Sequence, residues 1–263
     1  MKRVAVIFVL FFYGSLLGAF EGIETLFVKA NTAYKENDML QAQKYYLQII
    51  QQGFCNGFVF YNLGNTFLRQ GKTGEAILYY ELAKKWIPRD PELQENYRIA
   101  REPLSLKDSS IPMFFQVVFS WHFYTSLNEE FLLAFIFFLL GLLALYFRGR
   151  QNKSWRFPVL FFIFFAWVMM LSGSLYKIYQ ECYQISAVLT GNQVKVYFGP
   201  STSQERIQAI QGKIQTDLQL NSGLLFFIEN ITQNEGEEWW QARFENGVRG
   251  WVPAYQARKI QFP

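Results

Sequence analysis

The sequence predicts a multi-domain membrane protein with an all-α N-terminal part, a two-helix transmembrane hairpin and an all-β C-terminal domain. Three observations predict this class. The first hundred residues repeat with a period of 34 residues, the middle of the chain holds two long uncharged runs, and the end alternates short β-rich runs with turn residues. Aromatic residues make up 19% of the chain, more than an ordinary globular protein needs.

Residues 1–19 have the pattern of a secretory signal peptide. Two cations precede the apolar run Val4–Tyr13, and small residues lead up to a cleavage point after Ala19. We expect this segment to export the part that follows it. Cleavage after Ala19, or retention of the segment as an N-terminal anchor, are both open.

Residues 23–103 contain the repeats. Displacing the chain by 34 residues aligns Ala42 with Ala76 and Tyr46 with Tyr80. This is the helix–turn–helix period of tetratricopeptide repeats, which residues 57–90 resemble closely and residues 23–56 more weakly. The second repeat keeps the residue types of the family at Phe60, Leu63, Gly64, Phe67, Ala76, Tyr80, Ala83 and Pro88.

The spacing of these residues has a steric reason. Gly64 and Ala76 let the two helices of the repeat approach closely, and Pro88 ends the second helix. Two repeats leave one apolar face open. Asp90 and Pro91 form the start signal of a third helix, so we expect residues 91–103 to cap the repeats.

The resemblance implies a concave protein-binding face made by the first helix of each repeat. The residues that it places there are Phe27, Asn31, Phe58, Tyr61, Asn65 and Leu68. Asn31 and Asn62 match two positions of the variant that grips a peptide carboxylate, but Phe27 replaces its lysine. We therefore expect an aromatic groove for an extended or helical segment. The alternative is that some of these aromatic residues only fill the core.

Residues 128–147 and 157–176 are predicted to span a membrane. The uncharged runs Phe131–Phe147 and Phe157–Tyr176 are apolar on every face, whereas a core-facing surface helix has one apolar stripe. The segment 104–127 before them is apolar and aromatic but interrupted by polar residues. We interpret it as a juxtamembrane interfacial segment; a continuation of the repeat core is the alternative.

The loop over residues 148–156 predicts the orientation of the two helices in the membrane. Its cations are Arg148, Arg150, Lys153 and Arg156, and it has no acidic residue. Cytoplasmic loops carry such an excess, so both soluble domains are expected on the periplasmic side of a bacterial inner membrane. Lys/Arg and Asp/Glu are equal in number over 21–110 and over 177–263, which argues against a nucleic-acid partner.

Residues 184–263 predict a small β-barrel. The motifs "GPS", "WWQAR" and "GWVP" resemble the bacterial extracytoplasmic type of SH3-like domain. The resemblance implies a groove whose residues are Tyr197, Trp239, Pro253 and Tyr255. Trp240 and Trp251 are expected in the core, and Trp239 is the better candidate for contact with a ligand. Such domains bind partner proteins or cell-wall peptides.

Chemistry-bearing motifs are absent from the sequence. His122 is the single histidine, and no glycine-rich nucleotide-binding motif occurs. We expect no cofactor, no metal site and no enzymatic activity. A disulfide between Cys55 and Cys182 has no support from their predicted positions.

The order of these segments resembles the BatE-type proteins of the bacterial aerotolerance operon. The resemblance implies a non-catalytic scaffold in an envelope-stress complex, with membrane-anchored von Willebrand factor A-domain components and a MoxR-type ATPase as partners. The alternative is an envelope sensor that binds peptidoglycan or cell-wall peptides through the SH3-like domain.

Overall fold

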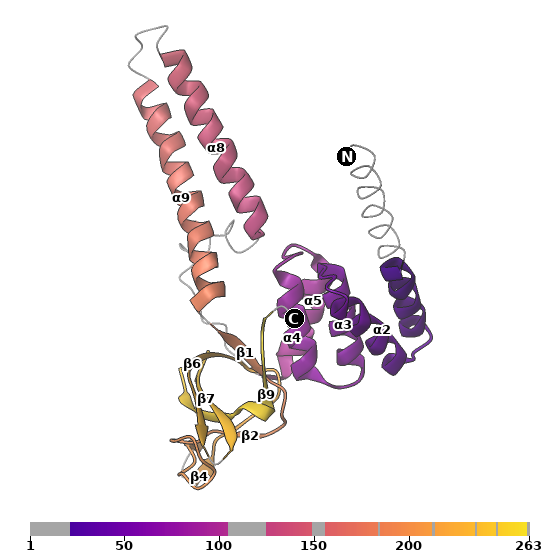
Figure 1. Ribbon diagram of the computed structural model, residues 1–263. Coiled ribbons are helices and arrows are strands. Elements are labelled where there is room, and N and C mark those ends of the chain that lie inside the picture. Colours follow the sequence, from indigo (N-terminus) through magenta and orange to yellow (C-terminus); the bar gives the residue numbers. More distant parts are fainter. Residues whose placement is uncertain are drawn as a thin grey trace, which may run out of the picture.

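The computed structural model comprises a helical domain, a pair of long helices and a β domain (Figure 1). It describes residues 22–104, 125–148, 156–183, 185–211, 214–234, 236–245 and 247–261. The predicted signal peptide therefore lies outside the described residues. So do Arg150 and Lys153 of the basic loop and most of the predicted interfacial segment.

The helical domain consists of antiparallel helices joined by short turns. They are the helix over residues 22–35, α2 (Met39–Gln51), α3 (Gly57–Arg69), α4 (Thr73–Lys84) and α5 (Pro91–Arg101), followed by the 3₁₀ helix η1 (Glu102–Leu104). Three helices begin at a capping side chain. Asp38, Asn56 and Asp90 each accept a hydrogen bond from a main-chain N–H in the first turn, at 2.8–3.1 Å. Pro91 follows the last cap, so the predicted start of α5 is where the sequence places it.

The second repeat packs as its residue spacing predicts. A methyl group at Gly64 would lie 2.6 Å from the Tyr80 ring, so only glycine lets α3 and α4 come this close. Ala76 and Tyr80 are fully buried, and Phe67 stacks on Tyr79 with the ring centroids 5.3 Å apart. α4 ends at Lys84, four residues before Pro88.

The two long helices, α8 (Leu127–Arg148) and α9 (Arg156–Tyr183), lie side by side (Figure 1). Their outward apolar side chains stay exposed: Leu132, Phe135 and Phe162 each keep more than half of their surface. Among the described residues, one helical segment, Leu160–Tyr179, is long and apolar enough to cross a membrane by length and composition. Arg148 ends α8 and Arg156 begins α9.

The β domain is antiparallel. Its strands are β1 (Ser186–Leu189), β2 (Val194–Lys195), β3 (Gln208–Gln211), β4 (Ile214–Asp217), β5 (Gln219–Leu220), β6 (Leu225–Asn234), β7 (Glu237–Phe244), β8 (Arg249–Pro253) and β9 (Ala257–Lys259), with the 3₁₀ helix η2 (Ala254–Gln256) before the last. Five strands form one sheet in the order β8-β7-β6-β1-β9, and β2-β5 and β3-β4 form two short pairs. Phe226, Trp240 and Phe244 lie in the core of this domain.

The β domain docks on the helical domain through β1 and α4 (Figure 1). A methyl group at Gly74 would lie 2.5 Å from the Leu189 carbonyl oxygen, and one at Gly223 would lie 2.7 Å from Ile77. Val188 of β1 belongs to the core of the helical domain rather than to that of its own sheet. The two domains therefore keep separate cores but meet through an apolar contact at Val188, which the sequence pattern did not predict.

Candidate functional site

The face formed by helix 22–35, α3 and α5, the groove face, carries the predicted protein-binding residues. Their exposure differs widely. Phe58 is 51% exposed, whereas Tyr61 is buried and the other four are partly buried. Phe27 meets Tyr46 of α2 edge-on, with the ring centroids 6.2 Å apart. Phe58 is therefore the most exposed of the six side chains.

The two asparagines of the groove face are partly buried, and their side chains hold neighbouring helices together. The Tyr46 hydroxyl and the Asn62 amide both donate to the side-chain oxygen of Asn31, at 2.6 and 3.2 Å. One repeat later, the Tyr80 hydroxyl and the Asn96 amide donate to the side-chain oxygen of Asn65, at 2.6 and 3.0 Å. We call these four bonds the asparagine ladder, and it joins each first helix to the next two helices.

The tyrosines of the ladder are held in the protonated, donating form. Burial is the largest cause, and it raises the pKa of both Tyr46 and Tyr80 far above the ordinary value. A buried phenol that donates to an amide oxygen satisfies both groups. The ladder consequently fixes the side-chain oxygens of Asn31 and Asn65 inside the domain.

The end of the groove face is acidic rather than basic. The Tyr61 hydroxyl donates to the Glu92 carboxylate at 3.3 Å and accepts a 2.9 Å bond from the Asn96 amide. Burial first, and then the Glu92 charge, raise the pKa of Tyr61, although its bond with Asn65 opposes them. This end of the groove face therefore presents a carboxylate and an amide, from Glu92 and Asn96 of α5.

In the β domain, three of the four predicted groove residues come together but are buried. Trp239 lies opposite Pro253 in the β7–β8 register, and the Tyr197 ring meets Trp239 edge-on with the centroids 5.5 Å apart. Trp239 is only 1% exposed, so the expectation that it faces a ligand is wrong. The Tyr197 ring packs against the face of β7 that carries Trp239, opposite the face of Trp240. Tyr255, at 68% exposed, is the open member of the four.

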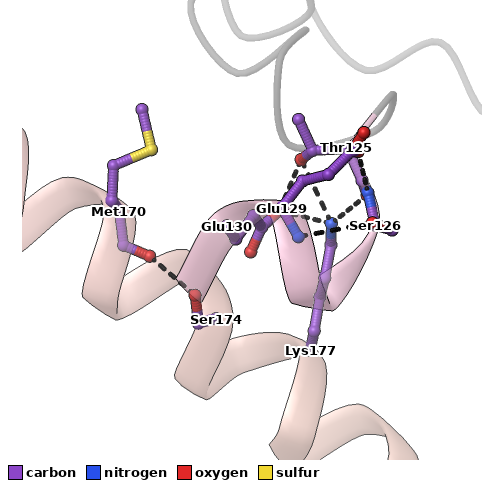
Figure 2. A network of polar contacts seen from close by, with 7 residues as sticks. All are labelled: Thr125, Ser126, Glu129, Glu130, Met170, Ser174 and Lys177. Atoms are coloured by element: carbon purple, nitrogen blue, oxygen red, sulfur yellow. Dashed lines mark hydrogen bonds and ion pairs between the residues drawn. The ribbon is translucent and has the colours of Figure 1, made fainter. Parts of the chain in front are cut away.

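A polar cluster joins the neighbouring ends of α8 and α9, and the sequence analysis missed it. Figure 2 shows Lys177 of α9 pointing at the first turn of α8, where it pairs with the fully buried carboxylate of Glu130 and donates to the Thr125 carbonyl oxygen at 2.7 Å. The Thr125 hydroxyl donates to the same carboxylate at 2.8 Å. This ion pair thus links the first turn of α8 to the last third of α9.

The start of α8 is capped by a reciprocal pair. The Ser126 N–H donates to the Glu129 carboxylate at 2.8 Å, and the Glu129 N–H points back to the Ser126 hydroxyl at 3.4 Å. Ser-x-x-Glu before an apolar run is the sequence signal of such a capping box, so this feature could have been found. Glu129 also pairs with Arg89 of the helical domain.

The described residues contain no cluster of three or more His, Cys, Asp or Glu side chains able to hold a metal ion. Cys55, in the turn between α2 and α3, is a free thiol. The side chain of Cys182 lies outside the described ones.

The similarities to known proteins concern the helical domain. A family model described as tetratricopeptide repeat matches residues 59–90, which cover most of α3 and α4. Among solved structures, the Arabidopsis OM64 TPR domain is 23% identical over a match that covers 33% of this chain and 71% of that chain, with a TM-score of 0.31. A search of curated proteins gives no match. The chain is thus a protein that contains a tetratricopeptide repeat.

Proposed function

We propose that the protein is a non-catalytic scaffold of the bacterial inner membrane that holds partner proteins on the groove face of its repeats. The observation that carries the proposal is the exposed Phe58 beside the asparagine ladder. The ladder makes the groove face rigid, and a rigid face with an exposed aromatic residue is preorganised for binding a peptide segment.

The anchor is the helical hairpin of α8 and α9, with both helices spanning the bilayer. Their exposed Phe and Leu side chains support this, because such a surface is unfavourable in water and favourable in lipid. The basic loop between them is cytoplasmic, and the helical and β domains are on the periplasmic side.

The partners are membrane-anchored von Willebrand factor A-domain proteins, working with a MoxR-type ATPase in an aerotolerance or envelope-stress complex of BatE type. The support is the order of repeats, hairpin and SH3-like domain. Binding of peptidoglycan by the SH3-like domain has less support, because three of the four residues of its groove are buried.

A pair of matched variants tests the groove face. Phe58→Glu places a charge on it, whereas Leu40→Glu changes a more exposed apolar residue on α2, outside it. After solubilisation, we expect Phe58→Glu to lose co-purification with the von Willebrand factor A-domain partner and Leu40→Glu to keep it. Equal recovery with both variants would refute the role of the repeats.

The orientation is tested separately by cysteine labelling. In a chain with Cys55 and Cys182 replaced by serine, we expect Asn152→Cys to react with a membrane-impermeant maleimide only after the cells are opened. Labelling of position 152 in intact spheroplasts would place the basic loop outside the cytoplasm and refute the proposed orientation.

A further inference from the structure

The helical domain has two edges, because its helices alternate in direction. The turns over residues 52–56 and 85–90 lie at one edge, which we call the hairpin edge. The turns over 36–38 and 70–72 lie at the other. Figure 1 shows the helical domain beside the lower end of α8.

An ion pair connects the hairpin edge to that end of α8. Arg89, in the turn between α4 and α5, pairs with Glu129 in the first turn of α8. Both side chains remain partly exposed, at 61% and 37%. The hairpin edge is therefore the part of the repeats that the structure ties to the apolar helices.

If the hairpin spans a bilayer, charged residues mark the position of the membrane–water interface. Glu129 and Glu130 directly precede the uncharged run that begins at Phe131, and Lys177 directly follows the run of α9. Since Lys177 and Glu130 pair with each other, the two helices reach this boundary at the same level. Arg89 stands at that level through its contact with Glu129.

Trp86 stands three residues before Arg89 on the same turn and is 46% exposed. The turn is held firmly: the N–H groups of Trp86 and Ile87 both donate to the Ala83 carbonyl oxygen at 2.9 Å, and a methyl group at Gly57 would lie 2.9 Å from Cβ of Trp86. An exposed tryptophan with neighbouring cations is the combination that membrane–water interfaces favour, because the indole is apolar with one polar N–H.

We propose that the hairpin edge rests on the lipid headgroup layer, with Trp86 inserted at the interface and Arg89 beside the phosphates. This inference rests on the proposed transmembrane hairpin. The contact holds the groove face at a constant height and angle above the bilayer, which suits partners that are themselves anchored in the membrane.

Site-directed spin labelling of the full chain in phosphatidylcholine/phosphatidylglycerol nanodiscs tests the contact. In the cysteine-free background, a nitroxide is placed at position 86, at position 36 on the opposite edge, or at the exposed position 135 of α8. We expect collisions with a water-soluble nickel complex to be about threefold rarer at 86 than at 36, as for a side chain in the interface. Position 135 should collide mainly with oxygen dissolved in the lipid.

The outcomes separate the two proposals. If position 135 is in lipid while 86 is as accessible to nickel as 36, the interfacial contact is refuted and the hairpin stands. If position 135 is also aqueous, the membrane hairpin itself is refuted. A charge reversal adds a second readout: Arg89→Glu should raise nickel access at 86, whereas Arg98→Glu, on the exposed surface of α5, should not. An unchanged value with Arg89→Glu would exclude Arg89 as a contact.

Discussion

Tyr80 donates a 2.6 Å hydrogen bond to the side-chain oxygen of Asn65, and Tyr46 makes the same bond to Asn31 one repeat earlier. Both bonds span 15 residues of the chain, so the repeat in the sequence is also a repeat of polar contacts. Because Tyr46 and Tyr80 are fully buried, their hydroxyls depend on these acceptors.

Replacing Asn65 with alanine should destabilise the helical domain. The change removes the acceptor of Tyr80 and Asn96 and leaves a buried hydroxyl without its partner, at a cost of about 1–3 kcal/mol. Chemical denaturation of the solubilised chain, followed by circular dichroism, measures the free energy of unfolding. The double variant Asn65→Ala/Tyr80→Phe should lose less than the sum of the single variants. Strict additivity would mean that the bond contributes nothing.

Gly64→Ala tests the close approach of α3 and α4. Alanine normally favours a helix over glycine by about 1 kcal/mol, but here its methyl group would meet the Tyr80 ring at 2.6 Å. We expect a lower thermal midpoint. Gly141→Ala in α8 is the matched control, since its methyl group would be at an ordinary 3.7 Å from Ile163. The close packing of α3 on α4 would be contradicted if Gly141→Ala lowered the thermal midpoint and Gly64→Ala left it unchanged.

Substitution of Gly74 should loosen the docking of the β domain. Gly74→Leu drives a side chain into the main chain at Leu189 and Thr190, which cannot move without β1. We expect faster hydrogen exchange at the Gly223 amide, which donates to the Leu189 carbonyl oxygen at 2.7 Å across from α4. The amides of the β7–β8 pair serve as the internal control, and their exchange should stay slow. Unchanged exchange at Gly223 would show that the two domains do not depend on each other here.

Glu81 makes the stability of the helical domain depend on pH. Burial alone would raise the pKa of Glu81, but the Lys84 charge, the Tyr97 hydroxyl and Arg101 together hold it below the ordinary 4.5. A lowered carboxyl pKa stabilises the fold above the ordinary value, and the contribution is lost as the pH falls through the folded-state pKa. Glu81→Gln should therefore cost stability at pH 7 and progressively less below pH 4.5. A cost that does not change between pH 7 and pH 3 would contradict this assignment.

Much of the helical domain could be predicted because its signals are local. The Gly64–Ala76–Tyr80 spacing and the Asp90–Pro91 start of α5 need only neighbouring residues. The burial of Trp239 could not be predicted. Alternation along β7 places Trp239 on the face opposite Trp240, and the Tyr197 ring that covers it comes from a distant part of the chain. The docking of Gly74 on Leu189 has no sequence signal for the same reason.

The pairing of Lys177 with Glu130 was also invisible in the sequence, and it gives the sharpest test of the hairpin. Lys177→Met removes the cation from a fully buried carboxylate, which costs about 3–5 kcal/mol in buried ion pairs. We expect the variant to separate α8 from α9 at a lower denaturant concentration, measured by fluorescence transfer between labels at positions 136 and 168. Adding Glu130→Gln should restore most of the loss, since a neutral amide needs no cation. If the double variant is as unstable as Lys177→Met, the lysine acts through its packing rather than through its charge.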